Sequence, residues 1–185
     1  MAKPRLFLVA PVGLSADQIL ACATAACAAG DVASIVVTTE VLPAVTSKLQ
    51  SLGLAVLANG KTGANCDGVH LNALADDIAA ARESLGKQNI VGAFCSASRH
   101  AAMQAAEDGA DYIAFSQNTY TPSEPIIGWW SDLFEIPCVA FDPVEVKDLD
   151  ILLPQRPDFI RPSEAIWSSP EEARHIVSGL TQRMD

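Results

Sequence analysis

The sequence predicts an α/β fold, a single-domain (β/α)8 TIM barrel over residues 1–185, trimmed because its third helix is short or absent. Apolar, β-branched runs alternate with helical stretches along the whole chain, and no Ser/Gly-rich linker divides it. Such apolar runs are typical of parallel strands covered on both faces, and eight of them separated by helices favour a closed barrel. An open doubly wound sheet is the alternative, but no glycine-rich phosphate loop follows the first run.

The expected strands are short apolar segments. They are Arg5–Val12, Ala33–Thr38, Leu54–Ala58, Gly68–Leu71, Asn89–Phe94, Tyr112–Ser116, Cys138–Phe141 and Phe159–Arg161. Helix starts are marked by first-turn prolines, and helix ends by glycines. The expected helices are Ala16–Ala29, Glu40–Leu52, Leu74–Leu85, Ser98–Glu107, Ile127–Phe134, Glu145–Leu153 and Pro170–Arg183. Residues 59–66 are too few and too rich in turn residues for a regular helix.

Composition excludes several classes of function. The formal net charge is −10, and an acidic surface repels phosphate backbones, which disfavours nucleic-acid binding. The apolar stretch Leu6–Val12 is too short for a signal peptide or a membrane span. We therefore expect a cytoplasmic protein whose partner is a small molecule, with neither nucleic acid nor membrane as a partner.

Two side-chain types add expectations about packing. The five cysteines form no C-x-x-C pair and are expected to be buried free thiols; Cys95 is singled out because it follows a strand. Trp129 and Trp130 are adjacent and cannot both face the core from one helix. One is expected inside, and the other over the pocket or in the interface of a homodimer.

Two short motifs connect the chain to a known family. Residues 66–71 read Cys-Asp-Gly-Val-His-Leu, and residues 109–112 read Gly-Ala-Asp-Tyr. Their sequence, order and spacing resemble those of the thiamine phosphate synthase/TenI family. The resemblance implies a (β/α)8 barrel and a Mg²⁺-assisted reaction: a pyrimidine diphosphate ionises, a thiazole phosphate nitrogen traps the carbocation, and pyrophosphate leaves.

Several positions that the resemblance implies for this chemistry are replaced. The second strand ends in residues 36–41, Val-Val-Thr-Thr-Glu-Val, without the family's amide and two cations. The third strand ends in Asn59-Gly60, which keeps an amide and loses a metal-binding carboxylate. The family's phosphate-binding glycine pair is Asp142-Pro143, where proline has no N–H and the carboxylate would repel an anion.

Candidate site residues lie where strands end, because a parallel barrel carries its functional groups at the carboxyl-terminal ends of the strands. The candidate catalytic residues are Asn59, His70 and Ser96. The candidate ligand-binding residues are Asn59, Asn72, Ser96, Thr121, Ser123, Asp142, Arg161, Ser163 and Glu164. Asp76 is considered for Mg²⁺, although the first turn of a helix also suits it structurally. Compared with the family, these residues predict a mouth that has lost cations and gained two carboxylates, Asp142 and Glu164, and has therefore become negative.

Three functions remain open at this point. The first is thiamine phosphate synthase-like activity, degraded or lost, with Mg²⁺ as the cofactor if the protein is active. Lost pyrophosphate contacts remove transition-state stabilisation, and each ~1.36 kcal/mol is tenfold in rate. The second is a non-catalytic or altered-specificity paralogue that binds a thiazole or pyrimidine precursor. The third is a TenI-like thiazole tautomerase, with His70 and His100 as the candidate histidines.

Overall fold

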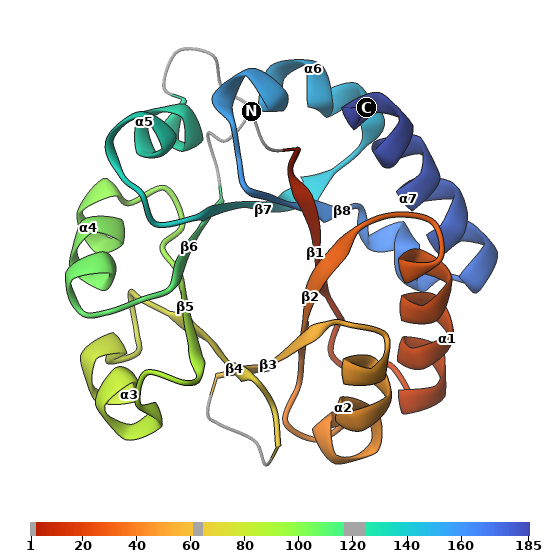
Figure 1. Ribbon diagram of the computed structural model, residues 1–185, viewed down its shortest axis with the longest axis horizontal. Helices are drawn as coiled ribbons and strands as arrows, with labels where there is room; N and C mark the ends of the chain where they lie inside the picture. The colour runs from red at the N-terminus through yellow and green to blue at the C-terminus, as the bar shows by residue number, and fades with distance from the viewer. Residues whose placement is uncertain (1–2, 61–64, 117–124) are drawn as a thin grey trace.

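The computed structural model describes residues 3–60, 65–116 and 125–185, in which eight parallel strands form one closed barrel. The strands are β1 (Arg5–Val9), β2 (Val32–Val37), β3 (Ala55–Asn59), β4 (Gly68–Asn72), β5 (Ile90–Phe94), β6 (Tyr112–Phe115), β7 (Cys138–Val144) and β8 (Phe159–Pro162). Each pairs with the next in sequence, and β1 pairs with β8 to close the ring. Figure 1 shows the strands as an inner ring with helices outside it. The predicted (β/α)8 barrel is confirmed.

Helices cover the outside of the barrel. They are α1 (Ala16–Cys27), α2 (Leu42–Ser51), α3 (Ile78–Leu85), α4 (Arg99–Glu107), α5 (Ile126–Leu133), α6 (Leu149–Leu152) and α7 (Pro170–Met184), with the 3₁₀ turns η1 (Val146–Asp148), η2 (Leu153–Gln155) and η3 (Glu164–Trp167). In the connection from β3 to β4, the described residues form no helix, as predicted. None of the helices in the described part of the chain is long and apolar enough to span a membrane.

The helix after β4 starts later than predicted, at Ile78 rather than Leu74. Asp77 caps it, accepting a hydrogen bond from the Ala80 N–H at 2.9 Å. The Asp76 carboxylate accepts a hydrogen bond from the Asn72 N–H at 2.8 Å and holds the preceding turn. Both carboxylates therefore serve the entry into α3, and Asp76 lies before the helix instead of in its first turn.

Three further differences from the prediction are larger than a shift of one or two residues. The first strand ends at Val9, three residues early, before a turn that contains Gly13 in a left-handed conformation. The strand β7 continues past Phe141 to Val144, and its register with β8 is irregular there. The helix expected over residues 145–153 is split into η1, α6 and η2, because Glu145 and Asp148 form a capping box around a 3₁₀ turn.

The barrel separates two apolar cores. One lies between the strands and the helices, and it includes Ile35, Trp130 and Val177. The other fills the barrel interior with residues that point inward from the strands; its buried members are Phe7, Val36, Leu57, Tyr112, Ala114 and Val139. Alternate residues of a strand face opposite sides, so one strand supplies both cores. The interior core is the floor on which any site at the carboxyl-terminal mouth is built.

Aspartates before three even-numbered strands fasten the amino-terminal end of the barrel. Each accepts a hydrogen bond from the backbone N–H of the preceding odd-numbered strand: Asp67 from Val56 at 2.7 Å, Asp111 from Val91 at 2.7 Å, and Asp158 from Cys138 at 2.8 Å. The first two are the aspartates of the motifs at residues 66–71 and 109–112. These motif residues therefore hold strand pairs together at the end opposite the mouth.

We expect Asp111→Ala to lower the free energy of unfolding by about 1–3 kcal/mol, because it leaves the buried Val91 N–H without its acceptor. It also removes the ion pair with Arg82. Asp111→Asn keeps an acceptor oxygen and should cost less. Urea unfolding followed by circular dichroism measures both. Asp108→Ala, at the end of α4, is the control and should change stability by less than about 0.5 kcal/mol. Equal stability of wild type and Asp111→Ala would contradict this role.

Glycine at position 92 is required by the interior packing. A β-carbon placed there would lie 1.9 Å from the Tyr112 Cζ and 2.2 Å from its hydroxyl oxygen. The Tyr112 ring therefore occupies the space that any side chain at position 92 would fill. Gly128 in α5 is different, since a β-carbon there would meet its nearest atoms at 3.7 Å, an ordinary contact.

Gly92→Ala should destabilise the protein by about 1–3 kcal/mol through overpacking of the barrel interior. Gly128→Ala is the matched control: it should be neutral, or stabilising by up to about 1 kcal/mol, since alanine favours helix. Thermal and urea unfolding of both variants measure this difference. A Gly92→Ala variant as stable as wild type would show that the interior has room we do not expect.

Candidate functional site

A cavity of about 280 Å³ opens at the carboxyl-terminal mouth of the barrel. Its wall is made by strand residues that are apolar, aromatic or uncharged polar groups: Val9, Val36, Asn59, His70, Leu71, Asn72, Phe94 and Phe141. None of these lining residues in the described part of the chain carries a formal charge at neutral pH. The cavity therefore suits a small, flat, neutral molecule better than a polyphosphate.

The side chain of His70 forms the floor of this cavity. Its ring stacks on Phe141, with centroids 4.9 Å apart and planes 16° apart, and its Nδ1 lies 2.7 Å from the Tyr112 hydroxyl. Burial, together with the positive charge of Arg161, lowers the pKa of His70 to about 4. The imidazole is therefore neutral at physiological pH.

The predicted cation Arg161 lies beside the cavity, and its charge is compensated. Its guanidinium stands 5.0 Å from the centre of the Phe141 ring and donates a 2.6 Å hydrogen bond to Glu164. Its side chain is only 14% exposed. A guanidinium stacked on an aromatic ring and paired with a carboxylate is held in place, so the ion pair brings two predicted site residues together at one side of the mouth.

Other predicted residues also lie at the mouth, but several are engaged in local structure. The Asn72 side-chain oxygen accepts a hydrogen bond from the Leu74 N–H at 3.0 Å, while Asn59 has no side-chain hydrogen bond to any described residue. The Asp142 carboxylate accepts a hydrogen bond from the Ser116 hydroxyl. The Ser163 side chain caps η3.

Ser96 follows β5 in a left-handed conformation, with φ of 51°. Its carbonyl accepts a hydrogen bond from the Ser116 N–H at 3.1 Å, so it joins the ends of β5 and β6. Ser96 is not among the residues that line the cavity. The two predicted hydroxyl residues Thr121 and Ser123 lie outside the described residues.

Sequence reasoning missed the aromatic wall of the site. Phe94 and Phe141, with ring centroids 5.1 Å apart, line the cavity, and Tyr112 supports the histidine from below. The sequence did contain a signal for this wall. Phe94 and Phe141 each lie two residues after an inward-facing position of the same strand, and such residues share one face of the strand. The polar residues at the strand ends, from which the site was predicted, do not carry this signal.

Other residues singled out from the sequence do not line the mouth cavity. Cys95 is fully buried in the core between strands and helices, and burial raises the pKa of its thiol to about 12. His100 and His175 are exposed on α4 and α7. Trp130 is buried, as expected for one of the pair, while Trp129 is half-buried beneath the Arg99 guanidinium, 4.7 Å from its ring centre. The homodimer stays a prediction.

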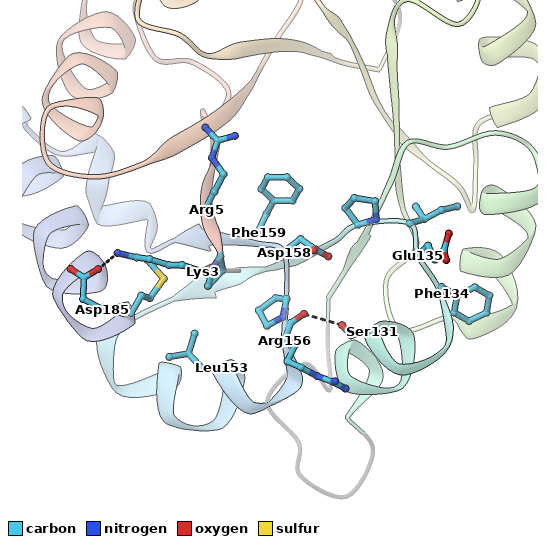
Figure 2. A pocket seen from close by; sticks show the side chains of 15 residues that line it. Lys3, Arg5, Ser131, Phe134, Glu135, Leu153, Arg156, Asp158, Phe159 and Asp185 are labelled. Atoms are coloured by element: carbon cyan, nitrogen blue, oxygen red, sulfur yellow. Dashed lines mark hydrogen bonds and ion pairs between the residues drawn. The ribbon is translucent and has the colours of Figure 1, made fainter. Parts of the chain in front are cut away.

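A larger cavity, of about 780 Å³, lies at the other end of the barrel, where β1 and β8 begin. Figure 2 shows its lining, with Lys3 paired to Asp185 and the Ser131 hydroxyl donating to the Arg156 carbonyl. Arg156 also pairs with Asp132. The charges of Lys3 and Arg156 are therefore engaged in holding chain segments together, and the strands' amino-terminal ends are not where parallel barrels carry chemistry. The smaller mouth cavity is the candidate site.

Comparison with known proteins agrees with the barrel and the motifs. Residues 56–153 match a family model described as thiamine monophosphate synthase. A thiamine-phosphate synthase from Rhodospirillum centenum is 30% identical, over 100% of this chain and 99% of the relative. Another from Erythrobacter litoralis is 39% identical over 58% of this chain and 55% of its own length. The solved thiamine phosphate pyrophosphorylase from Pyrococcus furiosus, 18% identical, superposes with a TM-score of 0.77 over 98% of this chain and 96% of that one.

The low pKa of His70 predicts a pH dependence of stability. Unfolded histidine takes up a proton near pH 6.5, while folded His70 does so only near pH 4. Between these values the unfolded state binds more protons, so stability present above pH 6.5 is lost as the pH falls towards 4. At pH 5 the loss should be about 2 kcal/mol.

Urea unfolding at pH 7 and pH 5 measures this loss. His70→Gln should remove most of the difference between the two pH values, whereas the exposed-site control His100→Gln should keep it. An unchanged pH dependence in His70→Gln would mean that His70 titrates normally in the folded protein.

Proposed function

The chain belongs to the thiamine monophosphate synthase family, and on that premise we propose that it binds a heteroaromatic thiamine precursor in its mouth cavity, with synthase turnover weakened or lost. One observation carries the proposal: the described residues that line the cavity are aromatic, aliphatic or uncharged polar groups. Phe94 and Phe141 offer apolar ring surfaces to a flat ligand. The Asn59 amide offers a donor and an acceptor to polar groups on a ring.

Weak turnover follows from the chemistry of the departing group. A leaving pyrophosphate develops negative charge that positioned cations must stabilise, and removing one such donor typically costs 10²–10³ in rate. Arg161 is the cation beside the cavity in the described part of the chain, and Glu164 already compensates its charge. At the position of the family's glycine pair, Asp142 adds a carboxylate and Pro143 lacks an N–H.

The carboxylates beside the mouth give little support to a Mg²⁺ site. Magnesium is usually bound through one or two carboxylates together with substrate phosphates, and Asp142 and Glu164 already pair with Ser116 and Arg161. Asp76, the carboxylate considered from the sequence, accepts the Asn72 N–H instead. We therefore propose no metal-dependent step.

Tautomerase activity is less well supported than ligand binding. A general base works best with a pKa near the operating pH, and the pKa of His70, about 4, is far below it. His100, the other candidate, is exposed on α4 and does not line the mouth cavity. Neither histidine has the combination of basicity and position that proton transfer to a bound thiazole needs.

Calorimetric titration tests the proposal directly. The ligands are hydroxyethylthiazole and hydroxymethyl-pyrimidine, each compared with its phosphorylated form. We expect the neutral rings to bind more tightly than their phosphates, since no uncompensated cation lines the described wall of the cavity. Tighter binding of every phosphorylated form, or robust Mg²⁺-dependent formation of thiamine phosphate from both precursors, would overturn the proposal.

A matched pair of variants locates the binding. Phe141→Ala removes an aromatic wall and should weaken binding of the neutral ring by about three- to tenfold, the equivalent of a lost aromatic contact. Phe134→Ala makes the same change at the opposite end of the barrel, beside the 780 Å³ cavity, and should leave affinity unchanged. Both variants are compared at a temperature where circular dichroism shows them folded. A larger effect of Phe134→Ala would place the ligand at the wrong end.

A further inference from the structure

Three neighbouring strands place a histidine, a glycine and a tyrosine at one level of the barrel. In register, His70 of β4 pairs with Gly92 of β5, and Gly92 pairs with Tyr112 of β6. Because the middle position has no side chain, the Tyr112 ring passes over it. The Tyr112 hydroxyl then comes within 2.7 Å of His70 Nδ1, two strands away.

The direction of this hydrogen bond follows from the burial of its partners. Tyr112 is 6% exposed, and His70 Nδ1 is the hydrogen-bond partner of its hydroxyl among the described residues. If Nδ1 carried the proton, the buried O–H would have no acceptor, at a cost of about 1–3 kcal/mol. Burial and the charge of Asp111 raise the pKa of Tyr112 well above its ordinary value, so the hydroxyl keeps its proton. Tyr112 therefore donates, and Nδ1 accepts.

The other nitrogen of the His70 ring reaches the cavity. With Nδ1 acting as an acceptor in a neutral ring, Nε2 must carry the hydrogen. The Tyr112 hydroxyl covers the Nδ1 side of the ring, and His70 is one of the residues that line the mouth cavity. Nε2, the other ring nitrogen, is therefore the one that can meet a ligand there.

We propose that Tyr112 is a positioning residue that fixes His70 in the Nε2–H tautomer, so that the mouth cavity presents a neutral N–H donor to a ring nitrogen of its ligand. The fixed tautomer stands on the buried hydrogen bond between Tyr112 and His70 and needs no ligand. Recognition of a ring nitrogen by this N–H group rests on the proposed function. The ring nitrogen is the chemical feature of the ligand that the site would select. A thiazole or pyrimidine nitrogen with a free lone pair would satisfy this donor, while a C–H in the same place would leave it unpaired.

Long-range ¹H–¹⁵N spectra of the histidine rings in the full-length protein at pH 7 test the tautomer without any ligand. His100→Gln and His175→Gln assign the signals by elimination. We expect a single Nε2–H pattern for His70, and the mixed pattern of solvated imidazoles for the other two. In Tyr112→Phe, which keeps the ring and removes the hydroxyl, the His70 pattern should become mixed. An Nδ1–H pattern in wild type, or an unchanged pattern in Tyr112→Phe, would overturn the proposal.

Binding of two near-isosteric probes tests the donor. Hydroxyethylthiazole has a ring nitrogen, and the corresponding thiophene has a C–H in its place. Wild type should prefer the thiazole about five- to tenfold, the usual value of one hydrogen bond, and Tyr112→Phe should reduce that preference towards one. Equal binding of the two probes by wild type would refute nitrogen recognition while leaving the proposed function intact. Binding of neither probe, together with no binding of the pyrimidine precursor, would refute the proposed function, and the nitrogen spectra would still decide the tautomer.

Discussion

The narrow interior of an eight-stranded barrel is the constraint on which the rest of this structure depends. Such a barrel is just wide enough for inward side chains to fill it, so a large residue on one strand requires a small one beside it. Gly92 has no side chain, so the Tyr112 ring occupies the space beside it and the Tyr112 hydroxyl contacts His70. The depth of the mouth cavity, the aromatic character of its wall and the neutral state of its histidine all follow from that filled floor.

The family motifs divide their residues between the two ends of the barrel. Asp67 and Asp111 hold strand pairs together at the amino-terminal end of the barrel. His70 follows Asp67 by a few positions, and Tyr112 is next to Asp111, yet these two side chains meet inside the barrel. A strand is short, and alternate residues face opposite sides, so one motif of a few residues can serve both closure and site. A chain can therefore retain these motifs because they stabilise the barrel, while the residues at its mouth are replaced by others of different charge.

The electrostatics of the mouth depend on pairing more than on composition. The sequence predicts lost cations and added carboxylates there, which suggests a negative mouth. In the structure Glu164 pairs with Arg161, and Asp142 accepts a hydrogen bond from Ser116. Partially buried charges are stabilised by partners more than by solvent, so these groups form the wall of the site and leave an uncharged cavity lining among the described residues.

The sequence by itself determined the barrel, because eight apolar runs separated by helices have few other ways to bury their surfaces. It also placed Asn59, His70 and Asn72 at strand ends, where they line the mouth cavity, since strand ends are visible in the hydrophobic pattern. The tertiary structure alone decided which of them meet. Asp76 and Ser96 serve turns, Arg161 lies against Phe141, and His70 contacts a tyrosine 42 residues away. These contacts depend on strand register and on the side chains of neighbouring strands, which local sequence patterns do not encode.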